Sequence, residues 1–228
     1  MNPTKQITVL MAEDHAIVRQ GLCALLNTDG HFKIVGEAQT GREAVKMALS
    51  LKPDVVLMDI AMPVLNGLEA TRQILAANPG AKVIILSAHS DDEYIQRMND
   101  AGAVGFLEKQ SSAEILTKAI QEVAKGRKYY SPAIAKRMRD AESQPRDREG
   151  MVKVDGQKLT SREAEVLQLV AEGRANKQVA AELGISIKTV EKHRQHLMDK
   201  LNIHDTASLT RYAISTGVIE NRVQLTIV

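Results

Sequence analysis

Short apolar runs rich in valine and isoleucine recur through the first half of the chain, and stretches of helical periodicity separate them. The third and fourth runs are apolar throughout, which is typical of strands buried on both faces of a parallel sheet. Five strands alternating with helices predict an α/β fold with a five-stranded, doubly wound parallel sheet. The predicted strands are Ile7–Met11, Phe32–Val35, Val55–Met58, Val83–Leu86 and Gly105–Leu107.

Four positions carry the pattern of a capping box, in which a hydroxyl side chain and a carboxylate three residues later bind each other's backbone N–H groups. We therefore expect helices to begin directly after these four hydroxyl residues. The pairs are Thr40 with Glu43, Ser90 with Glu93, Ser111 with Glu114, and Thr160 with Glu163.

The last third of the chain shows helical periodicity without a strand signal. The predicted helices span 159–173, 177–183, 187–201 and about 205–216. Asn176 and Ser186 are suited to cap the second and third helices, and Gly184 fits the tight turn between them. A helix, a short glycine-containing turn and a second helix form the motif that places a recognition helix in the major groove of DNA. A small all-α domain with a helix-turn-helix therefore follows the sheet domain.

These patterns predict a domain over 1–126, a linker over 127–158, a helical domain over 159–220 and a tail over 221–228. The linker is polar over 140–157, where Pro145, Gly150 and Gly156 are typical of a connector, and 131–139 has the pattern of a short helix. The tail suggests no function.

Composition narrows the class of protein. No apolar run approaches the roughly 20 residues of a membrane span, and the start of the chain does not resemble an export signal, so we expect a cytoplasmic protein. The single cysteine, Cys23, lies in an apolar helical stretch and is expected to be a buried core residue. The six histidines show no metal-ligand spacing, so the sequence predicts neither a zinc nor an iron site.

Charge is distributed unevenly along the chain. Residues 1–126 hold 12 basic and 15 acidic side chains, a net charge of −3, and residues 127–158 hold 9 and 5, a net charge of +4. Residues 159–228 hold 9 and 8, a net charge of +1. A basic linker is compatible with a nucleic-acid partner without demonstrating one.

Chemically useful side chains follow four of the predicted strands. They are Glu13, Asp14, Asp59, Ser87 and Lys109. Carboxyl ends of parallel strands share one edge of a sheet, where ligands bind. Clustered carboxylates suit Mg²⁺, a lysine and a hydroxyl can hold a phosphoryl group, and Asp59 can act as the nucleophile. Each residue taken singly is also compatible with an ordinary loop or surface position.

The third helix of the second domain has a polar face opposite its apolar stripe of Val190 and Leu197. Four side chains on this face suit contacts with base edges: Lys188, Glu191, Lys192 and Gln195. Four others suit phosphate contacts, which give affinity without sequence information: Lys177, Thr189, Arg194 and Lys200. On pattern alone, a helical hairpin for protein contact remains an alternative.

Residues 5–125 resemble the receiver domains of response regulators, which have a flavodoxin-like fold. The resemblance rests on four segments: Val9–His15, Asp54–Pro63 with Asn66-Gly67, Ile85–Ala88, and Ala101–Lys109. It implies phosphorylation of Asp59, with Mg²⁺ bound by Asp14, Asp59 and the Ala61 carbonyl and, through water, by Glu13. It further implies that Ser87 and Lys109 hold the phosphoryl group and that Phe106 is a rotating switch residue beside Ser87.

The chain departs from the receiver pattern in ways that bear on the switch and on the lifetime of the phosphorylated state. Gln110 follows Lys109 where the family often has proline or aspartate, and Phe106 lacks the hydroxyl of the commoner tyrosine. In the family, the side chains at positions 61 and 89 flank the water that hydrolyses the aspartyl-phosphate. Here they are Ala61, which cannot orient a water, and His89, which is bulky.

Residues 159–219 resemble the LuxR-type helix-turn-helix. The matching positions include Leu159–Leu167, Gly173, Asn176-Lys177, Thr189-Val190 and Lys200-Leu201. The whole chain is thus similar to the NarL/FixJ response regulators. The resemblance implies a histidine kinase, double-stranded DNA and RNA polymerase as partners, and a homodimer after phosphorylation, with the fourth helix often helping DNA-bound dimers to form.

Two other functions are compatible with parts of this pattern. A phosphatase with an aspartyl nucleophile needs a second acid two residues after Asp59, but Ala61 occupies that position. An atypical regulator switched by a ligand or a partner instead of phosphate is disfavoured by the complete acidic set. The sequence therefore predicts a transcription factor rather than an enzyme.

Overall fold

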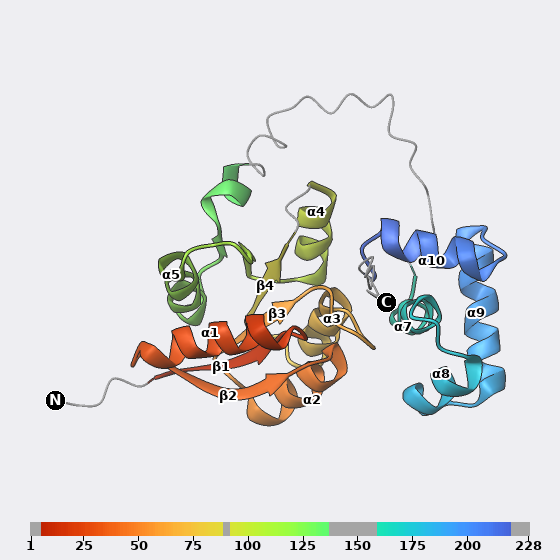
Figure 1. The fold of residues 1–228 in the computed structure, drawn as a ribbon, viewed down its shortest axis with the longest axis horizontal. Helices are drawn as coiled ribbons and strands as arrows, with labels where there is room; N and C mark the ends of the chain where they lie inside the picture. Colours follow the sequence, from red (N-terminus) through yellow and green to blue (C-terminus); the bar gives the residue numbers. More distant parts are fainter. Residues whose placement is uncertain (1–5, 89–91, 137–158, 220–228) are drawn as a thin grey trace, which may run out of the picture. The chain divides into compact units, whose positions relative to one another are not determined.

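The computed structural model describes residues 6–88, 92–136 and 159–219, which form two compact units (Figure 1). The elements of the first unit are β1 (Ile7–Ala12), α1 (Ala16–Thr28), β2 (Phe32–Ala38), α2 (Gly41–Leu51), β3 (Val55–Asp59), α3 (Gly67–Ala77), β4 (Val83–Ser87), α4 (Asp92–Ala101), β5 (Gly105–Glu108), α5 (Ala113–Ala124) and β6 (Tyr129–Tyr130).

The strands form one parallel sheet in the order β2-β1-β3-β4-β5-β6. Chain order reverses between β1 and β3, so the carboxyl ends of these strands flank the crevice where doubly wound sheets bind ligands. The predicted α/β fold and all five predicted strands are confirmed. Each strand extends one to three residues beyond its predicted range, because backbone pairing continues past the apolar run.

Helices α1 and α5 bury their apolar sides against the same face of the sheet. Cys23 and Leu26 of α1 join Leu57 of β3 and Leu116 and Ile120 of α5 in one core cluster, and each of these side chains is at most 7% exposed. Successive side chains of a strand point to opposite faces, so residues two apart line the same core. Cys23 is buried as predicted.

A sixth strand, β6, extends the sheet beyond the five that the sequence predicted. It pairs with β5 through hydrogen bonds from Tyr129 N to Val104 O and from Ser131 N to Phe106 O, both 3.0 Å long. An unpaired strand edge leaves backbone groups available to a passing segment. Two residues are too few to show a periodicity, which is why the pattern missed this strand.

Two predicted helix starts are wrong by one residue. Helix α5 begins at Ala113 with Ser112 at its N-cap, so Ser111 lies outside it. In the second unit, Asn176 is the first helical residue, and Ala175 occupies the N-cap, where its N–H donates to Gln178 Oε1. The Thr40 start is confirmed by the hydrogen bond from Glu43 N to Thr40 Oγ1. Ser90 lies outside the described residues.

The described part of the second unit consists of four helices, as predicted: α7 (Ser161–Ala171), α8 (Asn176–Leu183), α9 (Ile187–Leu201) and α10 (Thr206–Ser215). Thr160 and Glu163 form the predicted capping box, and Ser186 caps α9 by accepting from Thr189 N. Gly184, with φ of 63°, ends α8 in the left-handed region. Val190, Leu197 and Leu209 are fully buried between the helices.

The predicted linker is described only in part. Residues 132–136 are helical, and Ile134 is fully buried, which fits the predicted short helix over 131–139 in its first half. The rest of that helix, the polar segment over 140–157 and the tail over 221–228 lie outside the described residues.

Candidate functional site

The acidic pair follows β1 directly. Glu13 is fully buried, and the Asp14 side chain is 7% exposed. The hydrogen bond from Glu13 N to Ala38 O continues the ladder between β1 and β2 for one residue beyond the strand. The carboxylates therefore stand at the carboxyl edge of the sheet, as predicted.

Asp59 is the last residue of β3, and its side chain is only 2% exposed. The chain returns close to it at the start of α3, where Gly67 N donates to Ile60 O. A Cβ atom at Gly67 would lie 1.9 Å from the Asp59 carbonyl oxygen, so no other residue fits there without moving the backbone of Asp59. The Asn66-Gly67 pair of the receiver pattern thus has a steric basis.

Lys109 connects the carboxylates of Glu13 and Asp59. Its Nζ lies 2.8 Å from Glu13 Oε2 and 2.9 Å from Asp59 Oδ1. The Lys109 N–H donates to Ser87 O, so the end of β5 is fixed to the end of β4. The structure brings together these residues from β1, β3, β4 and β5 as the sequence predicted.

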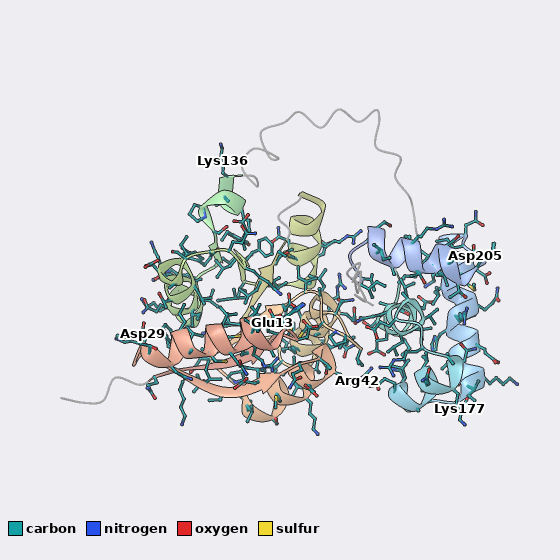
Figure 2. All side chains as sticks on the ribbon, in the orientation of Figure 1. Glu13, Asp29, Arg42, Lys136, Lys177 and Asp205 are labelled. Carbon is teal, nitrogen blue, oxygen red and sulfur yellow. The ribbon has the colours of Figure 1, made fainter. Side chains whose placement is uncertain are left out.

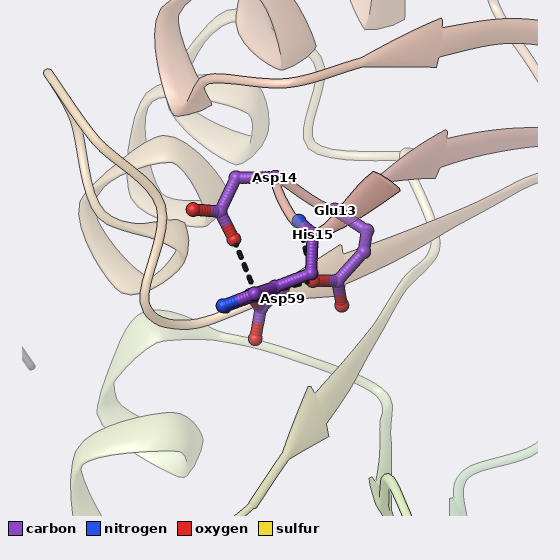
Figure 3. Close-up of side chains that lie close together, drawn as sticks. All are labelled: Glu13, Asp14, His15 and Asp59. Atoms are coloured by element: carbon purple, nitrogen blue, oxygen red, sulfur yellow. Dashed lines mark hydrogen bonds and ion pairs between the residues drawn. The ribbon is translucent and has the colours of Figure 1, made fainter. Parts of the chain in front are cut away.

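His15 also belongs to this cluster, although the sequence analysis assigned no histidine to it. Its Nδ1 lies 2.9 Å from Asp14 Oδ1 and 3.1 Å from Glu13 Oε1 (Figure 3). Histidine spacing does not reveal this role, because the partners of His15 are carboxylates rather than other histidines. Its position directly after Glu13 and Asp14 was the signal that could have identified it.

The electrostatics of the cluster favour a bound cation. The pKa of the Asp59 carboxyl is raised to about 6, chiefly by burial and then by the charge of Glu13, while Lys109 opposes the rise. Burial by itself lowers the pKa of Lys109, but its ion pairs with Asp59 and Glu13 raise it overall. Lys109 is therefore charged at neutral pH. Two buried carboxylates share this one ammonium, which leaves negative charge for a cation to neutralise.

The donor set fits a divalent cation. Among the described residues, Glu13, Asp14, His15 and Asp59 each offer a ligand atom, and these atoms lie within 4.8 Å of one another. Asp59 Oδ2 is buried and has no hydrogen-bond partner among the described residues. Hard cations such as Mg²⁺ prefer carboxylate oxygens and retain some water. The cluster could thus hold a cation and present Asp59 to a reagent.

The remaining predicted residues of this unit lie at or near the same edge of the sheet. Ser87 ends β4 and is 3% exposed. Phe106, in the middle of β5, is 2% exposed, and Ala61 lies two residues after Asp59 with 9% exposure. His89 lies outside the described residues.

The predicted base-reading residues share an exposed side of α9. Lys188, Glu191, Lys192 and Gln195 are all exposed. Their spacing of three and four residues places them in adjacent rows on the helix. Gln195 Nε2 donates to Asp199 Oδ1 one turn later, which orients the amide along the helix surface.

The predicted phosphate-contacting residues divide into two groups. Lys177 on α8 is exposed (Figure 2). Thr189 Oγ1 pairs with the Ser186 hydroxyl. Arg194 and Lys200 instead have partners on other helices: Arg194 donates to Asn176 Oδ1 and to Thr206 Oγ1, and Lys200 Nζ lies 2.7 Å from Glu163 Oε2. These last two side chains connect helices, a role that the sequence analysis did not foresee.

Within the described part of the chain, no helix is both long and apolar enough to cross a membrane.

Comparison with known proteins assigns both units. Residues 9–121 match the response regulator receiver domain, and residues 157–213 match the bacterial regulatory proteins of the luxR family. The transcriptional regulatory protein DegU of Brevibacillus brevis is 33% identical over 228 residues, covering 95% of this chain and 97% of the relative. The transcriptional regulatory protein LiaR of Bacillus subtilis is 36% identical over 211 residues, covering 91% and 96%.

Solved structures agree with these matches. A LuxR-family two-component response regulator from Aurantimonas sp. SI85-9A1 is 30% identical with a TM-score of 0.59, covering 61% of this chain and all of that one. The response regulator RcsB in complex with DNA is 25% identical with a TM-score of 0.56, covering 92% and 99%. This chain belongs to the response regulators of two-component systems, transcriptional regulators that join a receiver domain to a LuxR-type DNA-binding domain.

Proposed function

We propose that Asp59 accepts a phosphoryl group from a histidine kinase and that this modification controls sequence-specific DNA binding by α9. The observation that supports this most directly is the Asp59 carboxylate itself. One of its oxygens binds Lys109, while the other is buried without a hydrogen-bond partner among the described residues. An oxygen in that state is available to attack phosphorus.

Residues of this chain supply most of the groups that transfer of the phosphoryl group to Asp59 requires. An oxygen of Asp59 forms a bond to phosphorus as the bond to the donor's imidazole nitrogen breaks, and the imidazole leaves. Lys109 balances the charge of the phosphoryl oxygens, and the Ser87 hydroxyl donates to one of them. Mg²⁺, held by Asp14, Asp59 and the Ala61 carbonyl and through water by Glu13, would supply further charge neutralisation.

The signal then passes to the DNA-binding unit. We assign Phe106 to the switch beside Ser87, since it lies on the strand next to β4. The exposed side chains of α9, Lys188, Glu191, Lys192 and Gln195, read base edges, while Lys177, Thr189, Arg194 and Lys200 contact phosphates. RcsB, a relative over nearly its whole length, is described in complex with DNA. A phosphorylated homodimer that contacts RNA polymerase in the cytoplasm completes the proposal.

Labelling tests the phosphoacceptor. With acetyl phosphate and Mg²⁺, intact-mass analysis should show one added phosphoryl group in the wild type and none in Asp59→Asn. Asp29→Asn serves as the matched control, because Asp29 is a partly exposed aspartate three residues before β2, at the opposite edge of the sheet. Wild-type labelling of Asp59→Asn would overturn the assignment, as would loss of labelling in Asp29→Asn alone.

A further inference from the structure

A buried arginine lies one turn beyond the acidic pair. Arg19 of α1 is 8% exposed, although arginine is rarely buried without partners. Its Nη1 donates to Glu13 O at 2.9 Å and to Asp14 O at 3.3 Å. Its Nε donates to Glu37 Oε2 on β2 at 3.2 Å. The guanidinium thus binds the backbone of both residues of the pair.

These bonds fix the backbone from which both carboxylates project. The Glu13 N–H donates to Ala38 O of β2, and the Glu13 carbonyl accepts from Arg19, so both polar backbone groups of this residue are held. On the other side, His15 N donates to Glu13 Oε1. The chain leaves the sheet ladder after Glu13, and from there the hydrogen bonds of Arg19 to the Glu13 and Asp14 carbonyl groups hold the backbone from which the carboxylates project.

We propose that Arg19 is a positioning residue of the cation site, which holds the Glu13–Asp14 backbone so that both carboxylates face Asp59. This inference rests on the proposed function, which places Mg²⁺ at that site. Groups that orient metal ligands without touching the metal typically contribute 10- to 100-fold in affinity. The proposed role is one of position rather than charge, because Nη1 of Arg19 binds the backbone carbonyl groups of both residues of the pair.

Three variants separate positioning from charge and from folding. Arg19→Met keeps an apolar stem of similar length and removes every donor. Arg19→Lys keeps the charge but offers one ammonium in place of the planar fork. Glu37→Gln, the matched control, removes the carboxylate on the far side of the guanidinium and leaves both carbonyl bonds available.

Two measurements on the full chain carry the test. The first is calorimetric titration of unphosphorylated protein with MgCl₂, and the second is the rate of labelling by acetyl phosphate as a function of Mg²⁺. We expect the Mg²⁺ dissociation constant to rise about tenfold or more in Arg19→Met, to rise less in Arg19→Lys and to stay within about threefold of wild type in Glu37→Gln. The labelling rate at saturating Mg²⁺ should change far less than the half-saturating concentration.

Circular dichroism first establishes that each variant is folded. A folded Arg19→Met protein that binds Mg²⁺ within twofold of wild type overturns the inference, as does an equal loss in Glu37→Gln. Should Arg19→Met not fold, Arg19→Lys decides by the same criterion. If the wild type binds Mg²⁺ but is not labelled at Asp59, the proposed phosphoacceptor fails while the titration still tests Arg19.

Discussion

Ala61 brings a methyl group to a position beside the proposed phosphoryl site. It lies two residues after Asp59 and is 9% exposed. Hydrolysis of an aspartyl-phosphate needs a water in line with phosphorus, and positioning accounts for much of phosphoryl-transfer catalysis. A methyl group cannot hold that water by a hydrogen bond. We therefore expect a long-lived phosphorylated state, which suits the control of transcription.

Substitution at this position should change that lifetime. Ala61→Asn introduces an amide able to orient the water and should accelerate loss of phosphate from purified protein in Mg²⁺, by roughly tenfold if the amide gains one productive hydrogen bond. Ala61→Val adds bulk without a polar group and should not accelerate it. His89→Ala tests the other flanking residue, which lies outside the described residues. If the wild type loses phosphate fastest of all, the orientational argument is wrong and His89 assists the water.

Whether the sequence could predict a site residue depends on what places that residue in the site. Asp59, Ser87 and Lys109 were found because parallel topology alone brings strand ends to one edge. Arg19 and His15 were missed because their roles depend on how α1 leaves the sheet and on which carbonyl groups its first turn meets. Hydrophobic periodicity identifies the side of a helix that is buried, but it does not reveal a polar partner within the buried side.

Among the secondary-structure elements, helix ends were predicted where they depend on local sequence and missed where they depend on distant residues. The Thr160 and Ser186 caps were predicted because their hydroxyls bind backbone groups three residues later, a purely local geometry. The Asn176 cap was wrong because Arg194 of α9 engages the Asn176 side chain from a distant part of the sequence. Strand β6 was missed for a similar reason, since its two residues are ordered by pairing with β5 rather than by their own pattern.

The Glu163 carboxylate of α7 forms an ion pair with α9. Glu163 accepts from Thr160 N in the capping box and lies 2.7 Å from Lys200 Nζ. Burial by itself raises the pKa of Glu163, but these hydrogen bonds lower it overall. A depressed pKa in the folded state means that the stabilisation is present above the unfolded pKa, near 4.5, and is lost as pH falls through the folded value.

Glu163→Gln keeps an acceptor for Thr160 N but removes the charge that pairs with Lys200, so it should destabilise the helical unit at pH 7 by about 1 kcal/mol. The difference from wild type should shrink as pH falls below 4.5 and through the lowered folded pKa, where the wild-type carboxylate becomes protonated. Urea unfolding at pH 7 and pH 3, followed by circular dichroism, measures this difference in free energy of unfolding. Glu191→Gln, which changes an exposed glutamate of α9, should show neither effect. If the free energies of unfolding of wild type and Glu163→Gln differ by the same amount at pH 7 and pH 3, the stabilisation does not come from the ionised carboxylate.

At the scale of single helices, a second prediction concerns the exposed side of α9. Lys192→Ala and Gln195→Ala should weaken binding and also relax sequence preference, each by about 1–3 kcal/mol at the base pair that it reads. Lys177→Ala on α8 should weaken binding to all sequences alike and reduce its salt dependence, because one phosphate contact is lost. Affinities for a selected operator and for a random duplex, measured at several salt concentrations, separate base reading from phosphate contacts. Equal losses on both duplexes for Lys192→Ala and Gln195→Ala would exclude base reading.

At the scale of the whole molecule, phosphorylation can change DNA binding only if it favours a state that binds DNA better. A change of oligomeric state meets this requirement. One helical unit offers a single 15-residue recognition helix and reads few bases, whereas two units on adjacent half-sites double the contacts. Linking two modest binding events in one dimer raises affinity without any new contact in either unit.

We therefore expect phosphorylation of Asp59 to shift the full chain from monomer towards dimer, and operator affinity to rise with it. Sedimentation velocity with and without acetyl phosphate and Mg²⁺ measures the shift, and Asp59→Asn treated in the same way should remain in the unphosphorylated distribution. An operator with one half-site should lose most of the gain, because the second unit then has only non-specific contacts. A chain that stays monomeric in both states, yet binds the intact operator with full affinity, would show that the switch acts within one molecule and not through dimer formation.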